Sequence, residues 1–131
     1  MNRKTRRLLI RLASRLPGLY PLLAFITGRR VIVLGSSMAP TLLPGDRLVF
    51  DRLAYLLRPP AVGEVVLARH QARPGLRMIK RVARKGPEGY CLLGDNHDGS
   101  TDSRQLGPFR RRDILGRGWL VYWPPERFRR L

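Results

Sequence analysis

Short apolar stretches recur along this chain, and glycine or proline separates most of them. Val31 to Leu34 is apolar and ends at Gly35, while the stretch from Leu76 to Ala83 alternates apolar with basic residues. Apolar runs of this length, alternation with a period of two and turn residues at the ends are typical of strands. Strands are expected at residues 31–34, 47–53, 64–69, 76–83, 90–93 and 114–123. This spacing predicts a mainly β fold with one modest core.

The first thirty residues follow a different pattern. Four leucines recur there at helical spacing, at Leu8, Leu9, Leu12 and Leu16. Eight basic residues surround them, and no acidic residue precedes Asp46. We expect residues 1–30 to be a basic segment with a short amphipathic helix, and residues 31–131 to be the folded domain. Such a helix can lie on an anionic membrane, dock on an acidic partner, or cap the domain as a solvated arm.

The sequence does not predict a membrane-spanning helix. The charge-free run at 16–28 contains Pro17, Gly18 and Pro21, and it is shorter than the roughly 20 apolar residues that cross a bilayer. It does not resemble a cleavable leader either, because the residues after it are those of a core strand. A half-inserted hairpin around Pro17 stays compatible with the pattern. We expect a cytoplasmic protein, or one held peripherally at the cytoplasmic membrane.

The formal net charge of +17 favours an anionic partner. A small arginine-rich β domain that binds nucleic acid through phosphate contacts is the main alternative to an enzyme. Aromatic residues do not cluster within the basic stretches, so nucleic acid is not the expected partner.

Cysteine and metal-ligand patterns add little. Cys91 is the single cysteine, which excludes an intrachain disulfide, and its apolar neighbours predict a buried thiol. The sequence contains neither a glycine-rich phosphate loop nor a zinc-ligand spacing, so we expect no cofactor and no metal.

A candidate nucleophile follows the first expected strand. Ser37 lies on the turn after Leu34 and Gly35, and Pro40 prevents the strand from continuing. A serine hydroxyl is a poor nucleophile at neutral pH, so it needs a base elsewhere in the chain. A turn serine that bonds its own backbone is the structural alternative for Ser37.

The base is better sought among the lysines than among the histidines. His70 and His97 lie in polar surroundings, and arginine stays protonated, whereas a buried lysine loses its proton readily. Lys80 shares one strand face with Met78 and Val82, and such an apolar face lowers the pKa of an ammonium group. The alternative is that Lys80 extends along this face with its amine in water.

A third polar stretch, from Gly94 to Arg104, completes a resemblance to the signal peptidase I family of Ser/Lys proteases. Its boxes occur here in family order: residues 37–42 resemble the nucleophile box, 63–66 the strand box, 80–82 the general-base box and 94–104 the closing box. The resemblance covers about residues 31–123. Within the family, this short chain is most similar to the compact protease that matures nickel-type superoxide dismutase.

The resemblance implies a small β fold shared with self-cleaving repressor proteases of the LexA type, and a catalytic dyad of Ser37 and Lys80. Backbone amides of Ser36 and Ser37 are expected to hold the oxyanion, because Gly35 replaces the hydroxyl residue that some members carry there. Active-site support is expected from Gly94, Asp95, Asn96, Ser100, Asp102 and Arg104, with Met38 and Pro40 contacting substrate.

The implied reaction is endoproteolytic removal of a leader or pro-peptide from a protein substrate bound in extended form. Asp102 and Arg104 are expected to form an ion pair, with Ser100 orienting the lysine amine. A self-cleaving repressor itself would need a helix-turn-helix domain, for which residues 1–30 are too short.

Overall fold

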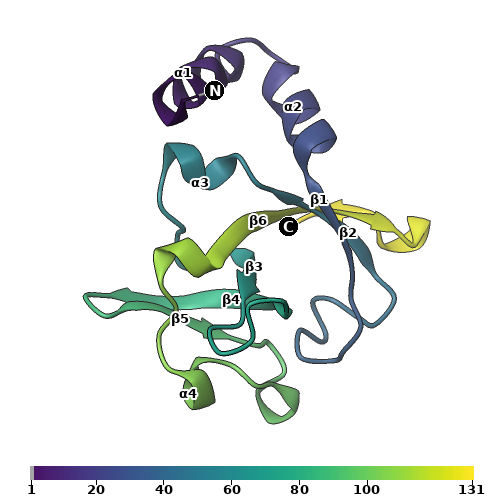
Figure 1. Cartoon of the computed structure of the whole chain (residues 1–131). Coiled ribbons are helices and arrows are strands. Elements are labelled where there is room, and N and C mark those ends of the chain that lie inside the picture. Colours follow the sequence, from purple (N-terminus) through teal and green to yellow (C-terminus); the bar gives the residue numbers. More distant parts are fainter. Residues whose placement is uncertain (1) are drawn as a thin grey trace.

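The computed structural model describes residues 2–131, and over these residues the chain folds around one antiparallel sheet (Figure 1). Its strands are β1 (Arg29–Ile32), β2 (Arg47–Asp51), β3 (Val65–Arg69), β4 (Arg77–Gly86), β5 (Gly89–Leu93), β6 (Ile114–Trp123) and β7 (Arg129–Arg130). They are ordered β1-β2-β6-β3-β4-β5, and β7 pairs with β6. The expected mainly β fold is confirmed, and each expected strand is found within three residues of its expected ends.

Helical segments are short and lie outside the sheet. They are α1 (Arg3–Ser14), α2 (Leu19–Thr27), α3 (Ala54–Leu57) and α4 (Ser103–Leu106), with the 3₁₀ turns η1 (His97–Gly99), η2 (Arg111–Asp113) and η3 (Pro125–Arg127). Figure 1 shows α1 and α2 as a helical arm at one end of the molecule and α4 at the opposite end.

Two apolar clusters form the core, one on each side of β3 and β4. Val66, Val82 and Phe109 belong to the first cluster, whereas Phe50 and Leu67 belong to the second. The period of two explains the division, because Val66 and Leu67 are consecutive and therefore face opposite sides. Phe50 and Phe109 are fully buried, so replacing either with alanine should cost about 3–5 kcal/mol of unfolding free energy.

The strand β4 pairs with a different neighbouring strand over each half of its length. Residues 77–81 pair with β3, whereas pairing with β5 starts at Arg81. The first half of β4, from Arg77 to Lys80, therefore presents an open edge. Such an edge can accept another extended segment.

The N-terminal arm contains two helices where the sequence pattern predicts one. Asn2 caps α1 by accepting a hydrogen bond from the Lys4 amide at 3.1 Å. Pro21 lies in the first turn of α2, where a missing amide hydrogen costs little. Tyr20 anchors α2 to the sheet, since its hydroxyl donates to Asp51 Oδ2 at 2.7 Å. Within residues 2–131, no helix has the length and apolar character to cross a membrane.

The expectation for Cys91 is wrong. Cys91 is only half-buried, because β5 is the last strand in the sheet order and its alternate residues face away from the core.

The basic residues after Pro125 contact the folded domain and do not form a free tail. Arg127 Nε lies 2.9 Å from buried Asp46 Oδ1, and β7 pairs with β6.

Candidate active site

The loop that carries Ser37 is held from both sides. Before it, Val33 exchanges backbone hydrogen bonds with Gly45 and Asp46, each at 2.8 Å. Beyond it, the Asn96 amide donates to the Ser37 carbonyl at 2.9 Å, and Asn96 Nδ2 donates to the Ser36 carbonyl at 3.2 Å. Residues 94–104, which we call the closing stretch, thus hold the backbone that carries Ser37.

Below this loop, Met38 is fully buried in the second apolar cluster, whereas Pro40 is exposed. Met38 therefore anchors the turn. Within residues 2–131, the backbone amides of Ser36 and Ser37 donate to no protein acceptor. These two N–H groups stay available to an incoming oxygen atom.

Lys80 is buried on the same side of β4 as Val82. Only 3% of its surface is exposed, and its Nζ donates to Ser100 Oγ at 2.9 Å. Ser100 Oγ in turn donates to Asp102 Oδ2 at 2.9 Å. The lysine amine therefore contacts a hydroxyl that is itself hydrogen-bonded to a buried carboxylate.

Burial dominates the ionisation of Lys80. Desolvation lowers the pKa of its ammonium, the negative charge of Asp102 opposes this shift, and the positive charge of Arg104 adds to it. The net pKa is lower than that of a free lysine. Lys80 therefore holds a larger neutral fraction near neutral pH than an exposed lysine does.

Asp102 stays charged although it is fully buried. Burial alone would raise the pKa of Asp102, but hydrogen bonds from the Arg104 side chain, the Gly94 and Arg104 amides and Ser100 hold it well below its usual range. Arg104 Nε lies 3.0 Å from Asp102 Oδ1, so the expected ion pair is confirmed. Asp102 also caps α4 in a reciprocal arrangement with Gln105.

Gly94 lies where the backbone closely approaches both Ser100 and the loop that carries Ser37. A Cβ at this position would lie 2.2 Å from Ser100 Oγ and 2.6 Å from the Ser37 carbonyl oxygen. No larger residue fits without moving the serine loop or the hydroxyl that holds Lys80. The expected support role of Gly94 thus has a steric basis.

Asp95 and Arg81 form a second polar contact on the opposite face of β4. Arg81 donates to both carboxylate oxygens of Asp95, at 2.9 and 2.8 Å, and the Thr41 hydroxyl donates to Asp95 Oδ2 at 2.6 Å. The hydrogen bond from Arg81 lowers the pKa of Asp95, with partial burial opposing it. This contact joins the closing stretch to β4 and to the serine loop.

A groove of about 480 Å³ connects the candidate nucleophile with the candidate base. Ser37 and Lys80 both line it, together with apolar residues of β1, the loop after it and the first half of β4. Within residues 2–131, no hydrogen bond joins Ser37 Oγ to Lys80 Nζ. Catalytic hydrogen bonds are often long before substrate binds, so the shared groove is the relevant geometry.

The sequence pattern did not predict several contacts that hold the site together. Thr41 and the ion pair between Arg81 and Asp95 join segments that are far apart in the chain. Ser103 Oγ accepts the Leu92 amide at 2.8 Å and ties α4 to β5. Only the alternation of β4 indicated that Arg81 faces away from Lys80, and nothing in the pattern identified its partner.

The histidines do not join the site. His70 Nδ1 accepts the amides of Ala72 and Arg73, both at 3.1 Å, so it closes a turn. His97 is exposed on η1. Neither histidine lines the groove that holds Ser37 and Lys80.

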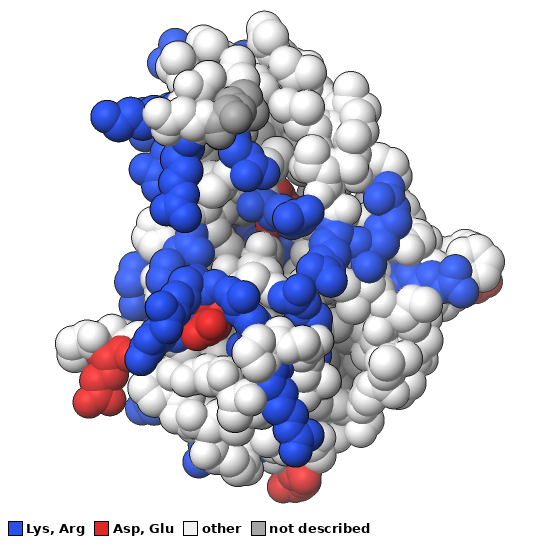
Figure 2. Space-filling view, viewed as in Figure 1, with Lys and Arg blue, Asp and Glu red and all other residues white. Residues whose placement is uncertain are grey.

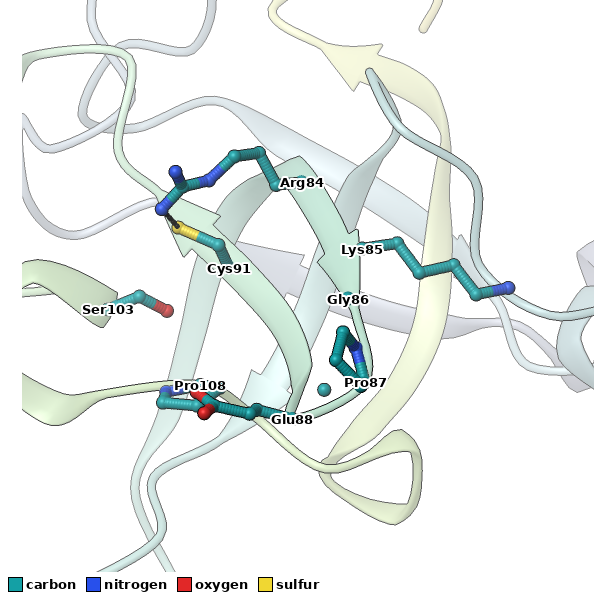
Figure 3. Close-up of a pocket in the computed structure, with 9 residues that line it drawn as sticks. Arg84, Lys85, Gly86, Pro87, Glu88, Cys91, Ser103 and Pro108 are labelled. Atoms are coloured by element: carbon teal, nitrogen blue, oxygen red, sulfur yellow. Dashed lines mark hydrogen bonds between the residues drawn. The ribbon is translucent and has the colours of Figure 1, made fainter.

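A second cavity, of about 380 Å³, lies between the β4–β5 hairpin and the segment around Pro108 (Figure 3). Arg84 and Cys91 meet there, with Arg84 Nη2 donating to Cys91 Sγ at 3.8 Å. Ser37 and Lys80 do not line this cavity. It is separate from the candidate active site.

Comparison with known proteins identifies the family. The family described as "Signal peptidase, peptidase S26" matches residues 9–89 and 84–123. The chain therefore belongs to this family of peptidases, as the resemblance of its boxes indicated. The mainly β sheet and the groove are consistent with this assignment.

Curated relatives carry related names. "Mitochondrial inner membrane protease subunit 1" of Xenopus tropicalis is 34% identical over 77% of this chain and 72% of its own length. "Signal peptidase I" of Leptolyngbya laminosa is 28% identical over 70% of this chain and 67% of its own. "Probable thylakoidal processing peptidase 2, chloroplastic" of Arabidopsis thaliana is 30% identical, but the match spans only 37% of that protein.

Proposed function

We propose that the chain is a serine endopeptidase in which Ser37 is the nucleophile and Lys80 the general base. The observation that carries this proposal is that a half-buried serine and a desolvated lysine line one groove. A hydroxyl, rather than a carboxylate, contacts the lysine amine. The amine can therefore be neutral without leaving a carboxylate unpaired.

The reaction follows from these positions. Neutral Lys80 takes the proton of Ser37 Oγ as this oxygen attacks the scissile carbonyl carbon. The amides of Ser36 and Ser37 stabilise the oxyanion, and protonated Lys80 then gives its proton to the leaving amine. Lys80 next takes a proton from a water molecule, whose oxygen attacks the ester. Collapse of that intermediate releases the acid and regenerates Ser37.

The substrate we propose is an extended leader or pro-peptide. The open edge of β4 at residues 77–80 and the residues after β1 flank the groove, so a peptide lying between them can add as a strand. The apolar lining favours small or apolar side chains near the cut. Maturation of nickel-type superoxide dismutase is the specific reaction that the sequence resemblance suggests.

Matched variants test the dyad. Ser37→Ala, Lys80→Ala and Lys80→Arg should each lower kcat/KM by about 10³-fold or more, since the two residues act as one unit. Ser36→Ala is the control, because only its backbone is assigned a role. Near wild-type cleavage by Lys80→Ala would disprove the dyad.

New N-termini in a cell extract identify the substrate. The extract is incubated with wild type and with Ser37→Ala, and the termini are compared by mass spectrometry. A new terminus on nickel-type superoxide dismutase supports the maturation role, whereas many termini on exported proteins support general leader removal. Identical termini in both samples would exclude proteolysis.

We also propose that the helical arm binds an anionic membrane surface peripherally. Leu8 is 58% exposed and Ile26 63%, and Leu12, Leu16, Leu22 and Phe25 are similarly exposed. Leu22, Phe25 and Ile26 share one face of α2 by their spacing. Figure 2 shows Lys and Arg side chains far outnumbering Asp and Glu across the arm and the face below it. Apolar faces flanked by basic residues are typical of helices that lie in a membrane interface.

Vesicle sedimentation tests this contact. Wild type should bind vesicles that contain phosphatidylglycerol and not vesicles of phosphatidylcholine alone. A variant with Leu12→Gln and Phe25→Gln should lose most of this binding, whereas Val62→Gln, an exposed apolar residue outside the arm, should not. Equal binding by all three proteins would exclude the arm as the contact.

A further inference from the structure

One end of the groove is basic, although most of its lining is apolar. Among the described residues that line it, only Lys80 and Arg77 are charged. Arg77 begins β4, three residues before Lys80, which places their backbones about 10 Å apart along the strand. Lys80 is buried and Arg77 is exposed. A peptide that lies along β4 from the Lys80 end therefore passes Arg77 about three residues from the reacting bond.

Three other arginines lie close enough to act on the charge of Arg77, and we call the four residues the Arg77 cluster: Arg29, Arg52, Arg69 and Arg77. Arg69 lies opposite Arg77 in the pairing of β3 with β4. Partial desolvation, and then the positive charges of Arg29, Arg69 and Arg52, lower the pKa of Arg77. The guanidinium groups of these three arginines thus repel that of Arg77, from segments that are distant in sequence.

Little negative charge offsets this cluster. In the part of the chain that the structure describes, only Asp113 pairs with one of its members, with Oδ1 3.6 Å from Arg69 Nε. Arg29, Arg52 and Arg77 pair with no carboxylate there. By contrast, Arg81 and Arg127 do have carboxylate partners. Arg77, which has no carboxylate partner among the described residues, therefore brings an unpaired positive charge to the groove.

We propose that the Arg77 cluster binds an acidic side chain of the peptide substrate, about three residues from the bond that Ser37 attacks. This proposal rests on the proposed function, because it takes the groove as the peptide site. A guanidinium binds a carboxylate through two parallel hydrogen bonds, which fixes the register of the peptide as well as its charge. The cluster would thus select substrates that combine small residues near the cut with an acidic residue further along the groove.

Competition between peptides tests the subsite. A peptide that wild type cuts is synthesised as a series of variants. In each variant, one position on the side of the scissile bond that lies toward Arg77 carries Glu, Gln or Lys. At one position, wild type should prefer Glu to Gln by about fivefold in kcat/KM, the size expected for a partly exposed ion pair. Arg77→Gln should lose this preference, and Arg77→Glu should prefer Lys. Arg84→Gln removes a charge from the same strand outside the groove and should keep the wild-type preference.

Binding separates this proposal from the proposed function. The affinity of Ser37→Ala for fluorescent Glu and Gln peptides is measured with and without Arg77→Gln. If wild type cuts no peptide but the Glu peptide binds more tightly through Arg77, the proposed function fails and the subsite stands. If Glu and Gln peptides are cut and bound equally well, the subsite is overturned and the peptidase stands. Loss of phosphatidylglycerol vesicle binding in Arg77→Gln, with the peptide preference unchanged, would also overturn it, in favour of a membrane contact.

Discussion

On β4, two consecutive basic residues face opposite sides of the sheet and meet different partners. Lys80 is buried, and its amine contacts the hydroxyl of Ser100, with Asp102 one hydrogen bond further away. Arg81 is half-buried and binds both oxygens of Asp95 directly. A direct carboxylate contact stabilises a cation, whereas a hydroxyl contact with burial favours the neutral amine. One strand therefore holds a structural ion pair and a candidate base side by side.

The difference shows how a small domain can hold a lysine whose ammonium group loses its proton more easily than that of a free lysine. If Asp102 contacted the Lys80 amine directly, the Coulomb attraction would raise the lysine pKa and oppose deprotonation. Arg104, Gly94 and Ser100 instead saturate this carboxylate with hydrogen bonds. The closing stretch thus orients the amine while limiting the stabilisation of its charge.

Replacing Lys80 or Arg81 with methionine should give the largest difference between the two faces, because one change should affect activity and the other stability. Lys80→Met should abolish peptide cleavage but leave the free energy of unfolding unchanged or higher, because an apolar side chain suits its buried position. Arg81→Met should lower that free energy by about 1–2 kcal/mol, since it leaves the Asp95 carboxylate without its partner. Urea unfolding and kcat/KM measured together check both outcomes. Equal loss of stability in the two variants would contradict the distinction.

Gly94→Ala should disrupt the Lys80 face through a single methyl group. The new Cβ would lie 2.2 Å from Ser100 Oγ and 2.6 Å from the Ser37 carbonyl oxygen, so one or both must move. We expect kcat/KM to fall by about 10²-fold, because small displacements of catalytic groups have effects of this size. Gly75→Ala is the matched control, since a Cβ there meets no atom within 4 Å.

The pH profile of cleavage should report the ionisation of Lys80. Cleavage should rise with pH through a pKa below that of free lysine, because deprotonation of a desolvated ammonium creates the base. Arg104→Gln removes a positive charge that lowers this pKa, so its profile should shift to higher pH. Arg110→Gln, an exposed arginine with no such effect on Lys80, is the control. A shift to lower pH in Arg104→Gln would contradict the assignment of the base.

The ion pair on the Arg81 face should have the smallest effect, which is on stability. This effect should depend on pH in the acid range. The pKa of Asp95 is lowered in the folded state, so its stabilising contribution is fully present above its unfolded pKa of about 3.9 and is lost as pH falls through the folded value. Asp95→Asn should be less stable than wild type by about 1 kcal/mol at neutral pH, and this difference should shrink below pH ~4. Thermal unfolding across this pH range measures the difference.

Much of the fold and the identity of the two candidate catalytic residues could be predicted from the sequence alone. Alternation along residues 76–83 placed Lys80 on the apolar face and Arg81 on the other, because the side-chain period of a strand is a local property. The turn at Ser37 and the strand positions followed from the same kind of signal. Even the short amphipathic helix is local, since its leucine spacing needs no tertiary contact.

Tertiary structure alone decided which partners these residues meet. The contacts of Lys80 with Ser100, of Arg81 with Asp95 and of Asp46 with Arg127 join segments separated by 20, 14 and 81 positions, and no local pattern specifies them. The exposure of the arm leucines and of Cys91 likewise depends on which element packs against each face. Periodicity defines the faces of a strand or helix, but only the packing of the whole chain determines what lies opposite each face. Packing therefore also determines the pKa of Lys80 and the charge of the groove.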